Sequence, residues 1–145
     1  MARFLIVDGH SAIFAWPEMR ALHLRRTALA RDALIKALTE YQDYTGVRVV
    51  AVFDGQGSKL EEATEPGGIQ VFYSAQGQTA DEVVERLVAT YAREHDLTVA
   101  TGDRLERQTA SSFGATCIST EMLHKMLEDS RGDLQRELRR HKRKL

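Results

Sequence analysis

The sequence is poor in cysteine, proline and long hydrophobic runs, and each shortage excludes a class of protein. The lone Cys117 cannot form an internal disulfide, and its place in the apolar run ATCIS predicts a buried, unreactive side chain in a reducing compartment. No apolar run approaches the roughly 20 residues that span a bilayer. The opening MARFLIVDG reaches Asp8 too soon for a secretory signal. We therefore expect a cytoplasmic protein with no membrane partner.

Several chemical signatures are missing as well. No second His or Cys stands at zinc-ligand spacing, which argues against a zinc site. No Ser-His-acid or Cys-His arrangement indicates a covalent nucleophile. The segment DGQGSK (54–59) contains glycines but lacks the spacing and the following helix of a phosphate-binding loop. These absences leave the acidic residues as the main candidates for chemistry.

The composition is that of a folded domain whose positive charge is gathered at one end. Hydrophobic residues make up 43% of the 145 residues and charged residues 28%, as in globular proteins. Residues 131–145 hold seven Lys or Arg against two acids, a net of +5, which leaves −6 for residues 1–130. This basic tail is compatible with a solvated helix face and with a contact to nucleic acid.

The hydrophobic pattern predicts strands that alternate with helices. Short apolar runs indicate five strands, at 3–8, 47–54, 69–74, 97–103 and 115–119. Helical spacing indicates helices at 27–44 and 79–95, with further helices on either side of the last strand. The polar, glycine-rich segment 55–68 predicts a mobile loop, and Gly132 is expected to break the final helix before the basic end.

This order predicts an α/β fold in one domain, residues 1–145, with a basic helical tail at about 131–145. Strands that alternate with helices through short turns form a mainly parallel sheet, here of about five strands, with helices on both faces. Ligands of such sheets bind at the carboxyl ends of the strands.

Four aspartates are predicted to meet at that edge of the sheet. Asp8, Asp54 and Asp103 each end a predicted strand, and Asp81 lies in the first turn of the helix after the third strand. Their mutual repulsion would be severe unless a divalent cation neutralised it. Carboxylate oxygens suit Mg²⁺ or Mn²⁺, which bind through a few carboxylates and keep some water. The pattern therefore indicates a metal site.

Ordinary helix capping could explain two of these positions. Asp81 and Glu82 suit the positive end of a helix, and Thr79 with Glu82 has the spacing of a capping box. Asp103 has the character of an N-cap, with Glu106 three residues later completing a similar box. Either aspartate alone would be read as structural, whereas the four together favour a metal site.

Turn chemistry could explain the other two. Asp8 precedes Gly9 and Asp54 precedes Gly55, which are common turn pairs. Each nevertheless ends a hydrophobic strand directly, and Asp54 could support the site rather than bind the metal. His10 could contact a phosphate or a base, or it could be an exposed loop histidine.

The sequence resembles the YacP-like NYN domains of the PIN-like nuclease superfamily. The resemblance runs from Arg3 to the basic tail, through LIVDGHSAIFAWPEMRAL, ALTEYQDYTGVRVVAVFD, TADEVVERLV and VATGD in that order and spacing. The discriminating pieces are AWPEM, YQDYTG and TADE. The resemblance implies a PIN-like three-layer fold. One member of the family is a ribosome-associated endoribonuclease that cleaves messenger RNA during translation.

The resemblance also implies an activity and a site. It implies a metal-dependent endoribonuclease that uses Mg²⁺ or Mn²⁺ to activate water against single-stranded RNA, leaving a 5′-phosphate and a 3′-hydroxyl. The implied catalytic and metal-binding residues are Asp8, Asp54, Asp81 and Asp103. Family members typically read Asp-Gly-Tyr-Asn after the first strand, whereas this chain has His10 and Ser11 in the last two places. Ser11 is shorter than Asn and lacks its amide, and His10 could still stack on a base.

Basic residues must hold an RNA strand that the acidic centre repels, and aromatic residues could stack on its bases. Candidate stacking residues are Phe14 and Trp16, although a Trp before Pro17 at a helix start commonly serves packing. Arginines on helix faces are likewise often only solubilising. The candidate basic contacts are Arg20, Arg25, Arg26, Arg104, Arg136, Arg139, Arg140, Lys142, Arg143 and Lys144.

Two other functions compete with the ribonuclease. One is a catalytically weak or inactive module of the same fold that binds RNA or the ribosome, for which the His10-Ser11 departure is the main support. The other is a phosphatase or phospho-acceptor domain, but the second Asp expected two residues after Asp8 is replaced by His10. The expected partner is RNA, with the ribosome as a second candidate, and a monomer is the default.

Overall fold

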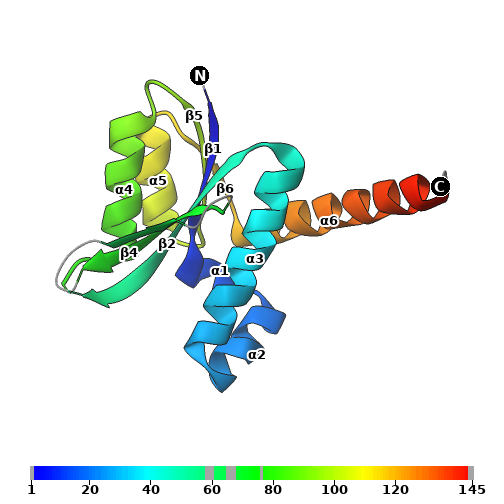
Figure 1. The fold of residues 1–145 in the computed structure, drawn as a ribbon. Coiled ribbons are helices and arrows are strands. Elements are labelled where there is room, and N and C mark those ends of the chain that lie inside the picture. Colours follow the sequence, from blue (N-terminus) through cyan, green and yellow to red (C-terminus); the bar gives the residue numbers. More distant parts are fainter. Residues whose placement is uncertain (1, 58–60, 65–67, 76, 144–145) are drawn as a thin grey trace.

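The structure is a computed structural model that describes residues 2–57, 61–64, 68–75 and 77–143. In it, one twisted sheet lies between two groups of helices (Figure 1). The elements are β1 (Arg3–Asp8), α1 (Gly9–Ala15), α2 (Pro17–Arg25), α3 (Thr27–Thr45), β2 (Arg48–Gly57), β3 (Glu61–Thr64), β4 (Gln70–Ala75), α4 (Ala80–Tyr91), β5 (Asp96–Ala100), α5 (Arg104–Ser112), β6 (Thr116–Ile118) and α6 (Thr120–Arg143).

The sheet has the strand order β3-β4-β2-β1-β5-β6. All neighbouring pairs are parallel except β3 and β4, which are antiparallel. β1 lies in the middle, where Ile6 stands opposite Val50 of β2 and Val99 of β5. The prediction of a mainly parallel sheet between helices is therefore confirmed. The carboxyl ends of five strands gather at one edge.

The alternation of side chains along β1 divides the core in two. Leu5 and Val7 face the side that α1, α2, α3 and α6 cover, where they pack with Leu34, Leu38 and Leu123. Ile6 faces the side that α4 and α5 cover. Because residues two apart on a strand share a face, Asp8 points to the same side as Ile6. The strand thus aims this carboxylate at the beginnings of α4 and α5.

Helix α3 shows how local sequence sets the element boundaries. Ala30, Leu34 and Leu38 recur at helical spacing and are fully buried. The helix ends at Gly46, whose φ of 77° is left-handed and accessible to glycine at little cost. The predicted helix at 27–44 is confirmed to within one residue.

The mobile loop predicted over 55–68 is wrong for the described part of that segment. β2 continues to Gly57, and Glu61–Thr64 forms the antiparallel edge strand β3, with Thr64 opposite Gln70. Residues 58–60 and 65–67 lie outside the described residues. The polar composition that suggested a loop is tolerated here because an edge strand needs a neighbour on one side only.

Gly132 does not break the last helix, contrary to the prediction. α6 runs without interruption from Thr120 to Arg143, since one glycine costs a helix only about 1 kcal/mol. Two interactions support the helix just after Gly132. Arg136 forms an ion pair with Asp133, and the Tyr44 hydroxyl donates to Glu137 Oε1 at 3.2 Å. No helix among the described residues has the length and apolarity that a membrane crossing requires.

Two other segments differ from their predictions. The residues between the first strand and α3 form α1 and α2, whereas the sequence indicated only a helix start at Pro17, where α2 begins. Cys117 is half-buried rather than fully buried, and its Sγ donates to the Arg107 carbonyl oxygen at 3.3 Å. It still behaves as a packed side chain.

Substituting Gly9 with Ala should destabilise the fold, because α1 begins against the ring of Phe53. A Cβ at Gly9 would lie 2.3 Å from Phe53 Cε1, and this ring is 3% exposed and cannot turn into solvent. We expect Gly9→Ala to lower the free energy of unfolding by about 1–3 kcal/mol, measured by urea denaturation. Gly132→Ala is the matched control: its Cβ meets only Arg136 at 3.5 Å, and it should raise stability by up to about 1 kcal/mol. Equal effects of the two changes would contradict this account.

Candidate metal centre

Asp8 is held in place by three hydrogen bonds from neighbouring segments. It is the last residue of β1, only 4% exposed, and it caps the N-terminus of α1. Its Oδ1 accepts from the Ser11 amide at 3.3 Å, and its Oδ2 accepts from the Ser11 hydroxyl at 2.8 Å. The buried Thr101 hydroxyl donates to the same Oδ2 at 3.2 Å. The strand that opens the sequence therefore ends in a carboxylate with a fixed orientation.

Asp81 and Glu106 complete a compact acidic group with Asp8. Asp81 lies in the first turn of α4, as predicted, and Glu106 in the first turn of α5. One oxygen of each of the three carboxylates lies within 4.8 Å of the other two. The three residues come from β1, α4 and α5, which meet at the carboxyl edge of the sheet.

Glu106 is the most deeply buried member of this group. It is 2% exposed, and neither of its carboxylate oxygens accepts a hydrogen bond from a donor in the described part of the chain. Burial, the hydrogen bond shared with Asp81, and the charges of Asp8, Asp81 and Asp103 raise the pKa of Glu106 to about 10. Without a cation, this side chain keeps a proton at neutral pH.

The pKa of Asp81 is also raised. A hydrogen bond from protonated Glu106 favours its charged form, but burial, the hydrogen bond with Asp103 and the charge of Asp8 together outweigh that effect. Raised pKa values in adjacent carboxyls show that negative charge is crowded here beyond what the protein alone compensates.

Asp103 serves first as a helix cap. β5 ends at Ala100, so the prediction that Asp103 closes this strand is wrong. Its Oδ1 accepts from the amides of Leu105, 2.9 Å, and Glu106, 3.3 Å. The Glu106 amide, the hydrogen bond with Asp81 and the Leu105 amide lower the pKa of Asp103. Asp103 thus contacts the acidic group through Asp81, at its exposed rim.

Asp54 lies outside the three-carboxylate group. β2 continues beyond it to Gly57, so Asp54 does not end the strand as predicted. Its Oδ1 accepts from the Ala80 amide at 3.0 Å, at the start of α4. Its Oδ2 lies 4.0 Å from Nδ1 of the exposed His10. The contact to Ala80 fixes the helix turn that carries Asp81.

The two aromatic residues proposed for base stacking differ in accessibility. Phe14 is 41% exposed, and its ring centroid lies 4.4 Å from that of His10, so an exposed aromatic pair stands beside the start of α1. Trp16 is 3% exposed, and its Nε1 donates to the Thr120 carbonyl oxygen at 2.9 Å. The prediction that Trp16 stacks on a base is therefore wrong, and this side chain packs in the core.

The predicted basic contacts do not surround the carboxylates. Arg20, Arg25 and Arg26 are exposed on α2 and at its end, and none forms an ion pair with the acidic group within the described residues. Arg104 is exposed beside Asp103. Arg107, which the sequence analysis did not select, lowers the pKa of Asp103 through its charge. Arg136, Arg139, Arg140 and Lys142 are exposed near the end of α6.

Glu106 was not predicted as a site residue, because its spacing from Asp103 is that of a capping box. In such a box the Glu side chain would reach back to the amide of Asp103. That amide instead donates to the Thr101 hydroxyl at 3.1 Å, which leaves Glu106 to turn inward. The helical spacing could have indicated the inward orientation of Glu106. Glu106 lies four residues before Ala110, and both residues are on the buried face of α5.

The carboxylate arrangement fits a hard divalent cation. Oxygens bound to Mg²⁺ lie about 2.1 Å from the ion, hence at most about 4.2 Å apart. The three oxygens within 4.8 Å of one another need only small side-chain movements to reach that spacing. A cation would also replace the proton that Glu106 shares with Asp81, and it would bind carboxylate oxygens that accept no hydrogen bond from the described residues. Asp8, Asp81 and Glu106 are the residues that could hold it.

The chain belongs to the YacP-like NYN domain family, which matches residues 5–145. The family and the acidic group together support a nuclease-like, RNA-related function. The chain is 34% identical to the YacP protein of Bacillus subtilis (strain 168) over 138 residues, which are 94% of this chain and 81% of that protein.

Two crystal structures of Rae1 (YacP) from Bacillus subtilis share the fold. One superposes with a TM-score of 0.80 at 32% identity and covers 97% of this chain and 82% of the Rae1 chain. A mutant form superposes with a TM-score of 0.82 at 31% identity, with 96% and 82% covered. The predicted family and fold class are both confirmed.

The protonated Glu106 makes stability depend on pH. Its pKa is about 10 in the folded protein against 4.5 as the ordinary value, so the folded state holds a proton that the unfolded state releases between these pH values. Stability in EDTA should fall as pH rises through this window, by at most about 1.4 kcal/mol per pH unit. Glu106→Gln removes this slope and should unfold at a higher temperature than the wild type at pH 8 without metal.

The same substitution should abolish stabilisation by a divalent cation. Thermal unfolding at pH 8 should shift upward with Mn²⁺ for the wild type and remain unchanged for Glu106→Gln. Glu94→Gln, at an exposed position, is the matched control and should behave as the wild type. A Glu106→Gln protein that is less stable than the wild type in EDTA at pH 8 would contradict the assigned protonation.

Proposed function

We propose that this protein is a metal-dependent endoribonuclease that cleaves single-stranded RNA with Mg²⁺ or Mn²⁺. The observation that carries the proposal is the buried Glu106, which meets Asp8 and Asp81 within 4.8 Å and has no hydrogen-bond donor among the described residues. A group of this kind is costly for folding unless a cation uses it. Membership of the NYN family supports the same reaction class.

Each residue of the site would have a distinct task. Asp8, Asp81 and Glu106 would hold the cation, and Asp103 lies at the rim, where it could accept a proton from water. A bound divalent cation supplies an activated water and neutralises charge on the scissile phosphate. Thr101 and Ser11 hold Asp8, and Asp54 holds the turn that carries Asp81.

The replacement of the family's Tyr-Asn by His10-Ser11 does not remove support from Asp8. Ser11 donates to this carboxylate from both its amide and its hydroxyl, at 3.3 and 2.8 Å. The contacts favour an active enzyme over an inactive RNA-binding module. The exposed pair of His10 and Phe14 beside Asp54 offers ring faces to a base near the metal centre.

The basic arm, which we define as residues 131–143 of α6, would hold RNA or the ribosome away from the metal centre. α6 starts at the acidic edge, where Gly102 lies close to both Ser11 and Thr120. A helix rises about 1.5 Å per residue, which places Arg136 about 24 Å further along. Figure 1 shows this end of α6 extending beyond the sheet. A messenger RNA on the ribosome would be a suitable substrate and would place the enzyme in the cytoplasm.

Removing one metal ligand should abolish cleavage. We expect Asp8→Asn, Asp81→Asn and Glu106→Gln each to slow cleavage by at least about a hundredfold, since even outer partners of metal ligands cost about 10–100-fold. Cleavage of naked and of translated messenger RNA would be measured with Mg²⁺, Mn²⁺ or EDTA, with mapping of the product ends. Asp43→Asn, at an exposed position on α3, is the control and should cleave as the wild type.

The outcomes separate the enzyme from the binding module. Cleavage that requires the metal and all three carboxylates supports the enzyme. RNA or ribosome binding without cleavage under any of these conditions would show the module instead. Cleavage that persists in Glu106→Gln would remove this residue from the site.

Neutralising the basic arm should weaken binding uniformly. Arg136, Arg139 and Arg140 changed together to Gln should lower affinity for RNA or ribosomes and reduce the slope of log affinity against log salt by about 0.7 for each phosphate that the arm no longer neutralises. The matched control neutralises three exposed cations elsewhere, Lys36, Arg86 and Lys125. An unchanged affinity and salt slope in the arm variant would show that the arm is only a solvated helix face.

A further inference from the structure

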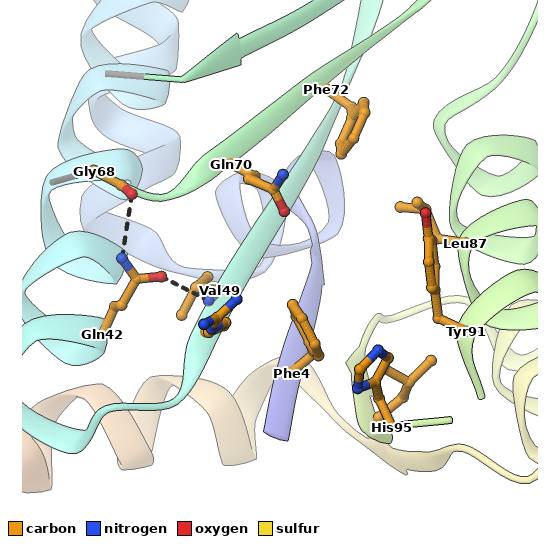
Figure 2. A pocket seen from close by; sticks show the side chains of 11 residues that line it. Phe4, Gln42, Val49, Gly68, Gln70, Phe72, Leu87, Tyr91 and His95 are labelled. Carbon is orange, nitrogen blue, oxygen red and sulfur yellow. Dashed lines mark hydrogen bonds between the residues drawn. The ribbon is translucent and has the colours of Figure 1, made fainter. Parts of the chain in front are cut away.

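A cavity of about 520 Å³ lies at the opposite edge of the sheet from the metal centre (Figure 2). Its lining includes residues at the amino ends of the strands: Phe4 of β1, Arg48 of β2, Gln70 of β4 and Leu97 of β5. Phe4 precedes Asp8 by four residues, which is about 13 Å along a strand. The cavity has the size of a small-molecule site, and it shares no lining residue with the acidic group.

Aromatic rings from separate elements form its walls. Figure 2 shows Tyr91 and Leu87 of α4 across the cavity from Phe4 and Phe72. His95 joins the two sides, because its ring centroid lies 5.1 Å from that of Phe4 and 6.2 Å from that of Tyr91. Tyr91 is 45% exposed, and its hydroxyl has no hydrogen bond within the described residues. A planar ring could enter between these walls.

The cavity also carries a positive charge and a hydrogen-bond donor. The Arg48 guanidinium lies 5.9 Å from the Phe4 ring centroid and has no carboxylate within 4 Å in the described part of the chain. Nδ1 of His95 accepts from the Ala2 amide at 3.3 Å, so the neutral ring carries its proton on Nε2. An arginine beside aromatic faces complements a ligand that is both planar and anionic.

We propose that this cavity binds a nucleotide, with its base stacked against Tyr91 and Phe4 and its phosphate at Arg48. The nucleotide could be a unit of an RNA strand or a free mononucleotide, since both present the same base and phosphate. The site is independent of the metal centre, and it would exist even if the protein cleaved no RNA.

Isothermal titration calorimetry of the full chain in EDTA tests the site without cleavage. The probes are AMP, UMP, inorganic phosphate and a six-nucleotide RNA. We expect a nucleotide or the RNA to bind at least tenfold more tightly than phosphate. Tight binding of AMP or UMP identifies a free nucleotide, and binding of the RNA alone identifies a strand.

Paired variants test the two contacts. Tyr91→Leu keeps an apolar side chain but loses the ring, and it should weaken binding about tenfold or more, whereas Tyr91→Phe should bind as the wild type. Arg48→Gln should weaken binding and reduce its salt dependence, whereas Arg86→Gln, on an exposed part of α4, should not. Thermal melting checks that each variant is folded.

Two results would overturn the site. One is the absence of binding for all four probes at millimolar concentration. The other is binding that Tyr91→Leu and Arg48→Gln leave unchanged. Glu106→Gln should bind these probes as the wild type does, so a failure of this site is distinguished from a failure of the metal centre.

Discussion

The repulsion among Asp8, Asp81, Asp103 and Glu106 is the interaction on which the rest of the site depends. Negative charge in a buried, low-dielectric position must be matched by a proton or by a cation. Burial and the neighbouring carboxylates raise the pKa of Glu106 to about 10 and raise that of Asp81 as well, so without metal the charge is reduced by retained protons. The arrangement is therefore less stable than the fold could be, and the proposed divalent cation would relieve the repulsion.

The fold makes this crowding possible because each carboxylate is anchored by a different contact. The Thr101 hydroxyl connects two of them, since it donates to Asp8 and accepts from the amide of Asp103. Asp54 holds the first turn of α4 through the Ala80 amide. These bonds fix positions without adding positive charge. The carboxylates therefore stay available to the proposed cation, whereas an arginine in the same place would pair with them.

The strands and helices that carry the site were easier to predict from the sequence than the residues that form it. Strand β1 and helix α4 follow from clear periodicity, so Asp8 and Asp81 were placed correctly. Glu106 was missed because its spacing from Asp103 fits a cap, and only tertiary contacts decide whether a glutamate turns back or inward. Asp54 was misplaced because the pairing of β2 with β4, which extends the strand to Gly57, depends on residues far apart in the chain. The edge strand β3 was not predicted for the same reason, because it forms by pairing with β4.

Charge separation explains why the basic arm and Arg48 lie at a distance from the three-carboxylate group, while Arg104 and Arg107 flank only Asp103 at its rim. An arginine close to the three carboxylates would pair with them and compete with the proposed cation, which favours placing the charges proposed to attract RNA elsewhere. The basic arm lies on the part of α6 that extends beyond the sheet (Figure 1). Arg48 lies at the opposite edge of the sheet, about 13 Å from the acidic edge along the strands. At 0.15 M salt the Debye length is about 8 Å. Screening over such distances lets an acidic centre and basic contacts coexist in one small protein without neutralising each other.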